Sequence, residues 1–481
     1  MTTTHELWIN GQDTKPSSGK YFDVLNPLDD SLFCKAAEAN ETDINKAVDA
    51  AHACFQTYRK SLAKDREAML CKAADLLERD REEFLDLLID EVGSPMNKAQ
   101  FEVNQTIGQL RAAAGSARRV TGQTMPSDTP GRLSMSMRKP LGVVASITPF
   151  NVPLLKAAKL VASPLATGNT VVLLSSEEAP AVSFRFARLI EEAGFPAGSL
   201  NVVSGFGVDI GDFLTGHPLV KAVMFTGSSV VGKHISEICG RNMKPCVLEL
   251  GGKSPFIVLA DADLGLAVQN AVMGMFFYQG QACIASSRII VEAAIYDQFV
   301  EMYSAAAKHL SMGDLRDMST ILGPIISVRQ RNRVRTHIED AVAKGATLVT
   351  GGEWEGNRCQ PTILTNISKE MTVCQEETFG PVTSIYSVAN VEEALELAND
   401  TRYGLSGAIC TNDLNKALML AHEVKTGMIH INAPSVYDEP HVPFGGVGDS
   451  GFGREGVDVD IDALTQWKWI TIQLPGFDQA H

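Results

Sequence analysis

Positive charge is scarce in this chain. Lys and Arg total 42 against 57 Asp and Glu over 481 residues, which gives a net charge of −15. A surface this acidic repels phosphate backbones and anionic lipid, so we expect no nucleic-acid partner and no membrane partner. An anionic ligand would then depend on backbone N–H groups, as at a helix N-terminus, rather than on a basic surface.

Any cysteine spacing typical of a metal or redox site is also missing. The nine cysteines include no C-x-x-C pair, and their odd number does not fit a closed set of disulfides. Residues 1–6 are polar and contain no apolar secretory segment. These absences predict a cytoplasmic, thiol-reduced protein without a metal site.

Long apolar runs are rare as well. One charge-free stretch, residues 264–287, has the length of a membrane span, but Gln279, Gln281 and other polar residues interrupt it. We therefore interpret it as buried protein interior. The overall composition, 45% apolar and 21% charged, is that of a globular protein, and the length predicts two or three domains.

Helical periodicity prevails over residues 43–119, with Thr42 as the expected N-cap. Residues 121–140 then alternate between apolar and polar side chains, which is typical of an exposed antiparallel hairpin. The segment 467–474 alternates in the same way and predicts another strand of this kind.

Between these segments, short β-rich runs alternate with helical ones. This rhythm predicts α/β architecture with parallel sheets covered on both faces. The segment 249–253 separates two such series and is the expected hinge. The strands of the first series are expected at 142–147, 170–174, 199–203 and 221–225, and those of the second begin at 255–259 and 287–292.

One strand end has the features of a phosphate site. Strand 221–225 runs into Thr226-Gly227-Ser228, and Gly232 is expected to open the next helix, whose free N–H groups suit a pyrophosphate. The nearby G-x-G pattern that contains Gly207 is equally explained by turn glycines. Glu177 follows another strand, where it would accept ribose hydroxyls or simply stabilise a helix N-terminus.

Cys283 stands among polar Gln and Gly residues within the charge-free stretch. A packed core cysteine is the ordinary alternative. The flanking residues, however, suit a turn beside a cavity. With Glu249 and Asn151 this thiol makes a set for acyl transfer, since a thiolate attacks a carbonyl, an amide stabilises the oxyanion and a carboxylate activates water. Spacing alone does not bring the three together.

Several motifs in one order resemble the aldehyde dehydrogenase superfamily. The segments 247–255 and 276–283 are similar to its glutamate and cysteine signatures. The resemblance runs from Ile9-Asn10-Gly11 to the last strand. The other segments that carry it are 148–154, 225–228, 376–381 and 443–446.

The resemblance implies two parallel-sheet, Rossmann-like α/β domains and a small antiparallel β arm for oligomerisation. It also implies a homodimer or homotetramer, in which the arm pairs with a neighbouring subunit. The expected boundaries are 1–120 with 141–250 for NAD binding, 251–432 for catalysis, 121–140 with 465–477 for the arm, and 433–464 for an active-site return segment.

The family's catalytic roles fall on four residues. Cys283 would be the nucleophile, and Asn151 with the Cys283 backbone N–H would form the oxyanion hole. Glu249 would deprotonate the water that hydrolyses the thioester. Glu455 resembles the family's second carboxylate, which orders that water or relays its proton, although a surface acid at a turn is the alternative.

The resemblance also implies a dinucleotide site. Where the family usually has Lys-Pro-Ser-Glu, this chain has Leu174-Ser175-Ser176-Glu177, and the loss of the lysine beside a retained acid favours NAD over NADP. The expected cofactor-binding residues are Thr148, Pro149, Phe150, Glu177, Gly207, Phe225, Thr226, Gly227, Ser228, Gly232, Leu250, Gly251, Glu377 and Phe379.

Lys159, one position earlier than the family's usual lysine, and the Asp-Glu-Pro before 443–446 resemble the benzaldehyde, vanillin and salicylaldehyde dehydrogenase branch. Oxidation of an aromatic aldehyde is therefore the leading hypothesis. Phe150, Lys159, Ile284, Tyr437 and Phe444 would line the substrate pocket, unless these aromatic residues are ordinary core.

Other functions stay open at this point. An aliphatic aldehyde or semialdehyde with NAD or NADP would use the same chemistry. A CoA-acylating enzyme would share Cys283, although Glu249 argues against it because a base that activates water competes with thiol transfer. A thioesterase-like hydrolase would not need the nucleotide motifs. A catalytically silent binding or structural protein would not need the Cys, Asn and Glu set.

Overall fold

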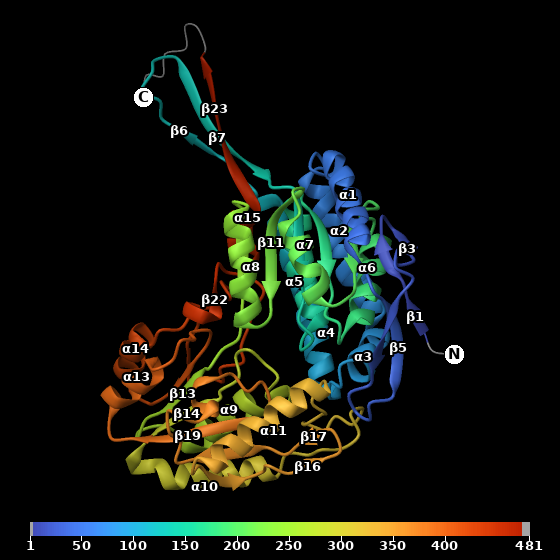
Figure 1. Cartoon of the computed structure of the whole chain (residues 1–481). Coiled ribbons are helices and arrows are strands. Elements are labelled where there is room, and N and C mark those ends of the chain that lie inside the picture. Colours follow the sequence, from blue (N-terminus) through green and yellow to red (C-terminus); the bar gives the residue numbers. More distant parts are fainter. Residues whose placement is uncertain (1–2, 474–481) are drawn as a thin grey trace.

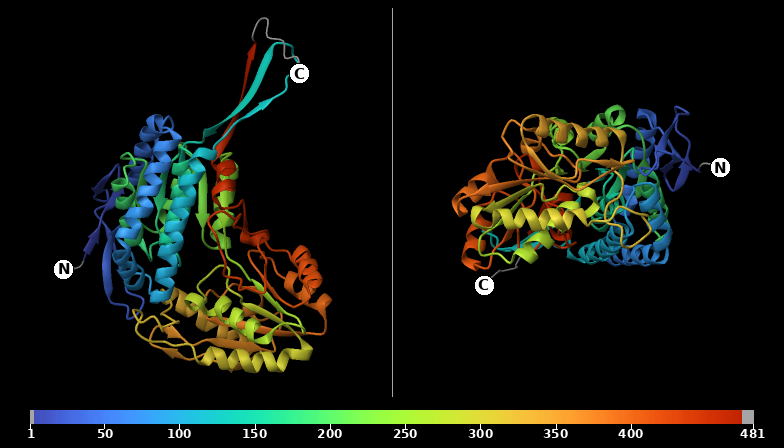
Figure 2. Two further views of the ribbon diagram at one scale, coloured as in Figure 1. Left: turned by 180° about the vertical axis from the view of Figure 1, so that it is seen from behind. Right: turned by 90° about the horizontal axis from the view of Figure 1, so that it is seen from below.

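The computed structural model describes residues 3–473. Two α/β bodies lie one above the other in Figure 1, and a narrow β arm projects from the upper body away from the lower one. The view from behind in Figure 2 shows the same separation of the two bodies. Each body is built on its own sheet.

The upper sheet has eight strands, of which the five central ones run parallel. Antiparallel strands flank them at both edges, whereas the sequence rhythm predicted four of the parallel strands and neither β12 nor the antiparallel ones. In spatial order the strands are β22 (Gly451–Phe452), β12 (Cys246–Glu249), β11 (Val220–Thr226), β8 (Val143–Ile147), β9 (Thr170–Leu174), β10 (Leu200–Val203), β2 (Leu7–Ile9) and β3 (Gln12–Thr14).

Helices cover both faces of this sheet, as the apolar strands require. One core cluster joins it to α1, α7 and α8, and another joins it to α2, α3, α4, α5 and α6. The N-cap of α1 is Asn40, whose side chain accepts the Thr42 and Asp43 N–H groups, so the prediction of Thr42 was wrong. The helices are α1 (Glu41–Tyr58), α2 (Ala63–Arg79), α3 (Arg81–Asp90), α4 (Met96–Ser116), α5 (Pro153–Ala166), α6 (Pro180–Glu192), α7 (Gly207–Gly216), α8 (Ser229–Arg241) and α15 (Val457–Leu464).

The lower sheet has seven strands, and only its edge strand β15 is antiparallel to its neighbour. Its strands in order are β15 (Thr347–Thr350), β18 (Thr362–Thr365), β19 (Val382–Val388), β14 (Arg288–Glu292), β13 (Pro255–Val258), β20 (Ala408–Cys410) and β21 (His430–Ile431). Its helices are α9 (Leu264–Phe276), α10 (Tyr296–Lys308), α11 (Val328–Ala343), α12 (Thr372–Gln375), α13 (Val391–Asn399) and α14 (Leu414–Glu423).

The arm is a three-stranded antiparallel sheet (Figure 1). Its central strand β7 (Arg132–Pro140) pairs with β6 (Gln123–Met125) and along its whole length with β23 (Thr465–Gln473). Side chains such as Trp469, which is 69% exposed, lie on its surface. The last part of the predicted arm, 474–477, lies outside the described residues.

Smaller elements complete the chain. The charge-free stretch forms α9 and the turn after it, and no helix among residues 3–473 is long and apolar enough to cross a membrane. The cytoplasmic location stays a prediction. The remaining strands are β1 (Thr3–His5), β4 (Tyr21–Leu25), β5 (Leu32–Ala37), β16 (Trp354–Glu355) and β17 (Arg358–Cys359), and the short helices are η1 (Ala117–Arg119), η2 (Phe277–Gly280), η3 (Ala293–Ile295) and η4 (Gly448–Ser450).

Candidate active site

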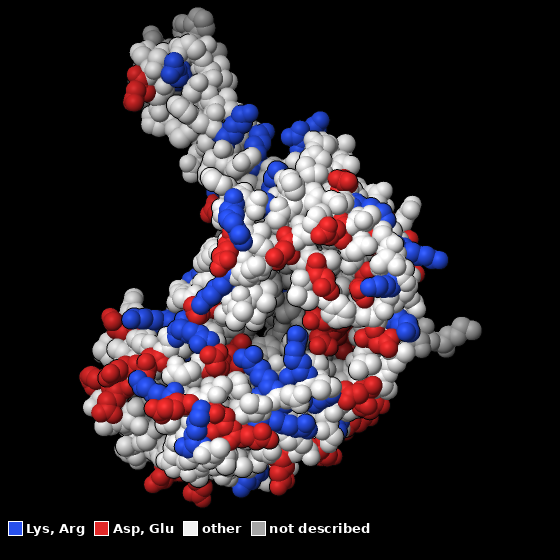
Figure 3. Space-filling view, in the orientation of Figure 1, with Lys and Arg blue, Asp and Glu red and all other residues white. Residues whose placement is uncertain are grey.

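A cavity of about 1030 Å³ lies where the two bodies meet. Four parallel strands of the upper sheet end at it, because Ile147 pairs with Leu174 and with Phe225, and Thr226 pairs with Glu249. The carboxyl ends of parallel strands are where α/β sheets bind ligands. Figure 3 shows the surface hollowed between the bodies, with Lys and Arg side chains gathered on its lower rim.

Nearly all of the expected cofactor residues line this cavity. The exception is Gly232, which packs beneath it, where an added Cβ would overlap the Leu250 side chain. The members that line it are Thr148, Pro149, Phe150, Glu177, Gly207, Phe225, Thr226, Gly227, Ser228, Leu250, Gly251, Glu377 and Phe379. Asn151, Glu249 and Cys283 line the same cavity.

The N-terminus of α8 faces this cavity. Helix α8 begins at Ser229, with Ser228 as its N-cap, so the prediction that Gly232 opens the helix was wrong by one turn. Ser228 accepts the Val231 N–H through its side chain, and Val230 and Val231 also line the cavity. A β-strand followed by a helix whose N-terminus faces a large cavity is a typical site for the pyrophosphate of a dinucleotide, because the first N–H groups of the helix are free to bind it.

Sequence reasoning missed the cations of the site. Arg329 and Arg333 of α11 and Lys156 of α5 line the cavity, so the expectation of backbone N–H groups alone was incomplete. Arg329 lies 3.6 Å from a carboxylate oxygen of Glu177. The arginines repeat at every second position over 329–335, but the pattern gives no sign that this helix of the lower body faces a ligand of the upper one.

The turn before Cys283 is left-handed. Tyr278 and Gln279 have φ values of 51° and 44°. This conformation is unfavourable for residues other than glycine, so surrounding contacts must stabilise it. The Gln279 side chain donates to the Pro324 carbonyl at 2.8 Å, and the Gln281 side chain accepts the Ile326 N–H at 3.1 Å. The flanking glutamines therefore build the turn beside a cavity that their polarity predicted.

The thiol and the amide lie on facing segments. The Asn151 side chain donates to the Gln281 carbonyl at 2.9 Å, two residues before Cys283. Burial raises the pKa of the Cys283 thiol to about 12, and the Lys156 cation opposes that rise. Gly252 approaches the Cys283 carbonyl so closely that an added Cβ would overlap it. The second glycine of the Glu-Leu-Gly-Gly motif is therefore required because no side chain fits there.

Glu249 is buried without a partner. Both of its carboxylate oxygens lack a hydrogen bond to any residue within 3–473. Burial first, and then the negative charge of Glu455, raise its pKa well above the usual value. A raised pKa makes the Glu249 carboxylate a stronger base than an exposed one.

Glu455 is 1% exposed, so its interpretation as a surface acid was wrong. Its carboxylate accepts a hydrogen bond from Lys156 Nζ at 2.6 Å, and Thr226 Oγ1 lies 3.4 Å from its other oxygen. Lys156 was missed because a single lysine in an apolar helix has no sequence signature of its partner. The Lys156 cation thus interacts electrostatically with the carboxyl groups of Glu455 and Glu249 and with the Cys283 thiol.

Of the expected substrate-pocket residues, Lys159 and Phe444 contact each other. Lys159 Nζ lies 2.6 Å from Asp438 and 4.7 Å from the centre of the Phe444 ring. Tyr437 is 52% exposed and bonds to Glu439. Phe150 lines the large cavity and meets Phe379 edge to face at 5.7 Å, whereas Lys159, Ile284, Tyr437 and Phe444 are not part of its lining.

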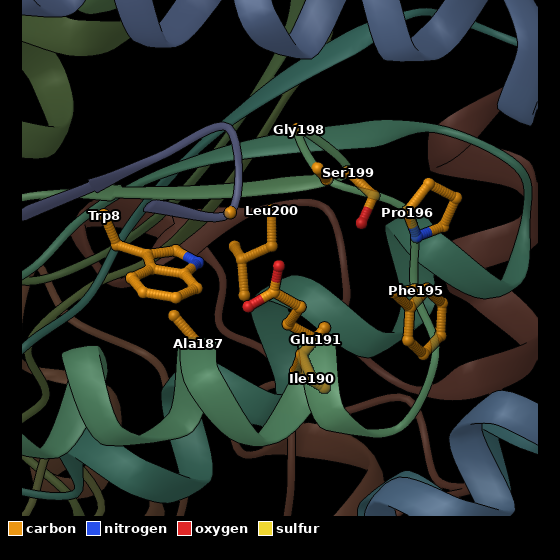
Figure 4. A pocket seen from close by; sticks show the side chains of 11 residues that line it. Trp8, Ala187, Ile190, Glu191, Phe195, Pro196, Gly198, Ser199 and Leu200 are labelled. Atoms are coloured by element: carbon orange, nitrogen blue, oxygen red, sulfur yellow. The ribbon is translucent and has the colours of Figure 1, made fainter. Parts of the chain in front are cut away.

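A second pocket, between the β2–β3 turn and α6, is far smaller. Figure 4 shows Trp8, Glu191 and Leu200 around it. Its volume of about 10 Å³ suffices for about one water molecule. It is too small to bind a nucleotide or an aldehyde.

An α/β protein with this cavity and this Cys, Glu and Asn set belongs to the aldehyde dehydrogenase family, whose model matches residues 14–470. The chain is 41% identical over 470 residues to vanillin dehydrogenase from Pseudomonas fluorescens, covering 97% of each chain. It is 37% identical over 480 residues to salicylaldehyde dehydrogenase from Pseudomonas putida, covering 99% of each.

Solved structures agree with this assignment. The fold matches a salicylaldehyde dehydrogenase from Pseudomonas putida G7 complexed with salicylaldehyde at a TM-score of 0.96 and 36% identity, covering 100% of this chain and 99% of that one. The predicted fold class and the predicted resemblance to the aromatic branch are therefore confirmed. The chain is an aldehyde-oxidising enzyme of a family that uses NAD or NADP.

Proposed function

We propose that the protein oxidises an aromatic aldehyde to the carboxylate with NAD as the oxidant. The observation that carries the proposal is the convergence of Cys283, Asn151 and Glu249 on one cavity with the α8 N-terminus. The similarity to vanillin and salicylaldehyde dehydrogenases supports the substrate class. Phe150 on the cavity wall and Phe444 beside Lys159 offer apolar surface for a ring.

The first step is attack by the Cys283 sulfur on the aldehyde carbon. The thiol must lose its proton, which its raised pKa opposes and the Lys156 cation favours. The new C–S bond places negative charge on the former carbonyl oxygen. The Asn151 amide and the Cys283 backbone N–H donate to that oxygen and stabilise the thiohemiacetal.

A bound nicotinamide supplies the acceptor for the hydride whose departure leaves a thioester on Cys283. Glu249, once deprotonated, takes a proton from the attacking water, and the C–S bond breaks to release the acid and the thiol. Glu455 and its partner Lys156 are the nearby charges that would relay a proton to or from Glu249. A CoA-acylating enzyme would not need Glu249 in this place.

NAD is favoured by Glu177, whose carboxylate suits the two hydroxyls of an adenine ribose and repels a 2′-phosphate. NADP is the second candidate because Arg329, 77% exposed, stands beside Glu177. The dissociation constants of both nucleotides, measured by calorimetry, test this choice. Arg329→Ala should leave NAD affinity within about threefold, because exposed ion pairs contribute little. Tighter binding of NADP than NAD by the unaltered protein would reject the NAD preference.

We also propose that the arm joins subunits into a homodimer or homotetramer. Its outer strands β6 and β23 each pair on one side only within residues 3–473. A neighbouring subunit would satisfy these open edges. The proposed domain boundary near residue 250 is supported by the end of β12, and the proposed return segment contains β22, which pairs with β12 again.

The function is tested with a panel of aromatic and aliphatic aldehydes and with NAD, NADP and CoA supplied separately. We expect reduced nicotinamide with aromatic aldehydes and no requirement for CoA. Preference for short aliphatic aldehydes would reject the substrate class. Cys283→Ala should abolish oxidation and leave NAD binding intact, and turnover by that variant would exclude Cys283 as the nucleophile.

A further inference from the structure

A buried ion pair lies behind the reacting residues, outside the large cavity. Lys98 Nζ and a Glu102 oxygen are 2.5 Å apart on α4, and their side chains are 1% and 0% exposed. Lys98 also donates to the Ser94 hydroxyl at 3.0 Å. Neither residue lines the cavity or touches Cys283, Asn151 or Glu249 through a hydrogen bond.

The second oxygen of Glu102 binds the start of α5. It accepts the Leu154 N–H at 2.8 Å and the Leu155 N–H at 3.2 Å. Val152, the N-cap of this helix, makes no side-chain cap bond, so Glu102 supplies the acceptor that the first turn requires. Asn151 immediately precedes that turn. Glu102 therefore fixes the segment that carries the oxyanion donor.

Lys98 contacts the other segment. Its ammonium lies 4.1 Å from the centre of the Tyr278 ring, in cation–π contact. The Tyr278 hydroxyl donates to the Val92 carbonyl at 3.1 Å. Tyr278 is the first residue of the left-handed turn that leads to Cys283. Lys98 therefore fixes the segment that carries the nucleophile.

We propose that Lys98 and Glu102 are positioning residues that hold Asn151 and Cys283 in register across the oxyanion hole. This inference rests on the roles proposed above for those two residues. The ion pair joins the two segments directly. The Glu102 carboxylate binds both Lys98 and the start of α5, and the Lys98 ammonium binds both Glu102 and the Tyr278 ring. Oxyanion donors act only at a narrow range of distances, so a small shift in either segment slows the step that forms the thiohemiacetal.

The ion pair is poorly explained as a source of stability. Removing two charges from water costs several kcal/mol, and well-packed apolar residues of similar volume stabilise a buried site equally or better. A geometric role explains why charge is placed there. The carboxylate fits the dipole of α5, and the ammonium fits the face of an aromatic ring.

The fold provides a matched control in Glu91. This carboxyl is also fully buried, and it accepts the Ala181 N–H at 2.7 Å and the Val182 N–H at 3.0 Å at the start of α6. Glu91 accepts N–H groups at the same two helix positions as Glu102, but through both oxygens, and no cation pairs with it within residues 3–473. Helix α6, moreover, carries none of the reacting residues. Glu91→Gln therefore tests the loss of a buried carboxyl at a helix start without disturbing the oxyanion hole.

The experiment is a double-mutant cycle read by the pre-steady-state burst of reduced nicotinamide at saturating NAD. Asn151→Ala should slow the burst by about 10²–10³-fold, as loss of an oxyanion donor does. Glu102→Gln should slow it about tenfold, with NAD affinity unchanged, and Glu91→Gln should leave it within about twofold. In the Asn151→Ala background, Glu102→Gln should have a clearly smaller effect than in the unaltered protein.

Additive effects in that cycle would overturn the proposal, because Glu102 would then act by a route other than Asn151. An equal loss in Glu91→Gln would assign the effect to helix stability. If Glu102→Gln does not fold, Glu102→Asp, which keeps the charge but shortens the side chain, enters the same cycle with the same criterion. Failure of the unaltered protein to reduce the nucleotide with any aldehyde, or an unchanged rate of reduction in Asn151→Ala, would instead reject the proposed function.

Discussion

Replacing Lys156 by Met tests whether this buried cation both favours the Cys283 thiolate and neutralises Glu455. Lys156 Nζ lies 2.6 Å from Glu455, and both side chains are almost fully buried. Methionine has a similar length and fits an apolar helix such as α5. The substitution therefore removes the charge with little change in volume.

Two effects of different size are expected. An unpaired Glu455 destabilises the fold by about 3–5 kcal/mol, the usual result of breaking a buried ion pair. The pKa of the Cys283 thiol, already about 12, rises further because the Lys156 cation that opposes the rise is gone. Each unit of that rise reduces the thiolate fraction tenfold. We expect Cys283 to react with iodoacetamide at least about tenfold more slowly at pH 9.

The assay follows alkylation of Cys283 by mass spectrometry and, separately, thermal unfolding. Lys156→Met with Glu455→Gln should restore most of the stability, because no unpaired charge remains, but not the alkylation rate. Lys159→Met is the matched control, since Lys159 is another buried lysine of α5 that pairs with Asp438. An alkylation rate within twofold of the unaltered protein, despite a lower Tm, would refute the electrostatic argument.

Three further changes probe the base, the backbone and the pH dependence. Glu249→Gln should give a normal burst followed by turnover at least about 10²-fold slower, and full-rate steady turnover would exclude Glu249 as the base. Gly252→Ala should lower kcat at least about 10²-fold, because the new Cβ would overlap the Cys283 carbonyl; Gly240→Ala, in open space on α8, should leave kcat unchanged. Burial raises the pKa of Asp460 from 3.8 to about 7, so its contribution to stability is lost as pH rises from about 4 to 7. Asp460→Asn should therefore gain stability over the unaltered protein across that range, by about 4 kcal/mol at most, in denaturant titrations; a pH-independent difference would contradict it.

The strands were the most predictable part of the fold. Buried parallel strands are short apolar runs, so the run at 170–174 was predicted with its observed bounds. The edge strands β2, β3 and β22 were not predicted, because two or three residues carry no periodic signal. The N-cap of α1 was misplaced by two residues, since Asn40 and Thr42 are both good caps and only the chain path decides between them.

The residues proposed to react were predicted from motifs, and their partners were not. Cys283 and Glu249 stand in segments whose letters resemble a family, whereas Lys156 and Glu102 are single charges in helices. Glu102 meets α5 some 52 residues away, and Lys156 meets Glu455 across 299. Only the packing of α4 on α5, and of both on the return segment, brings such groups together. Contacts of that range leave no local pattern in one sequence.

In the proposed reaction, the charges around the thiol affect both halves. Lys156 favours the Cys283 thiolate, whereas burial first and then the negative charge of Glu455 raise the pKa of Glu249. Lys156 interacts with Glu455, Glu249 and Cys283 at once. Loss of the thiolate charge on acylation would leave that cation to the two carboxyl groups, which favours ionisation of Glu249 once the thioester exists.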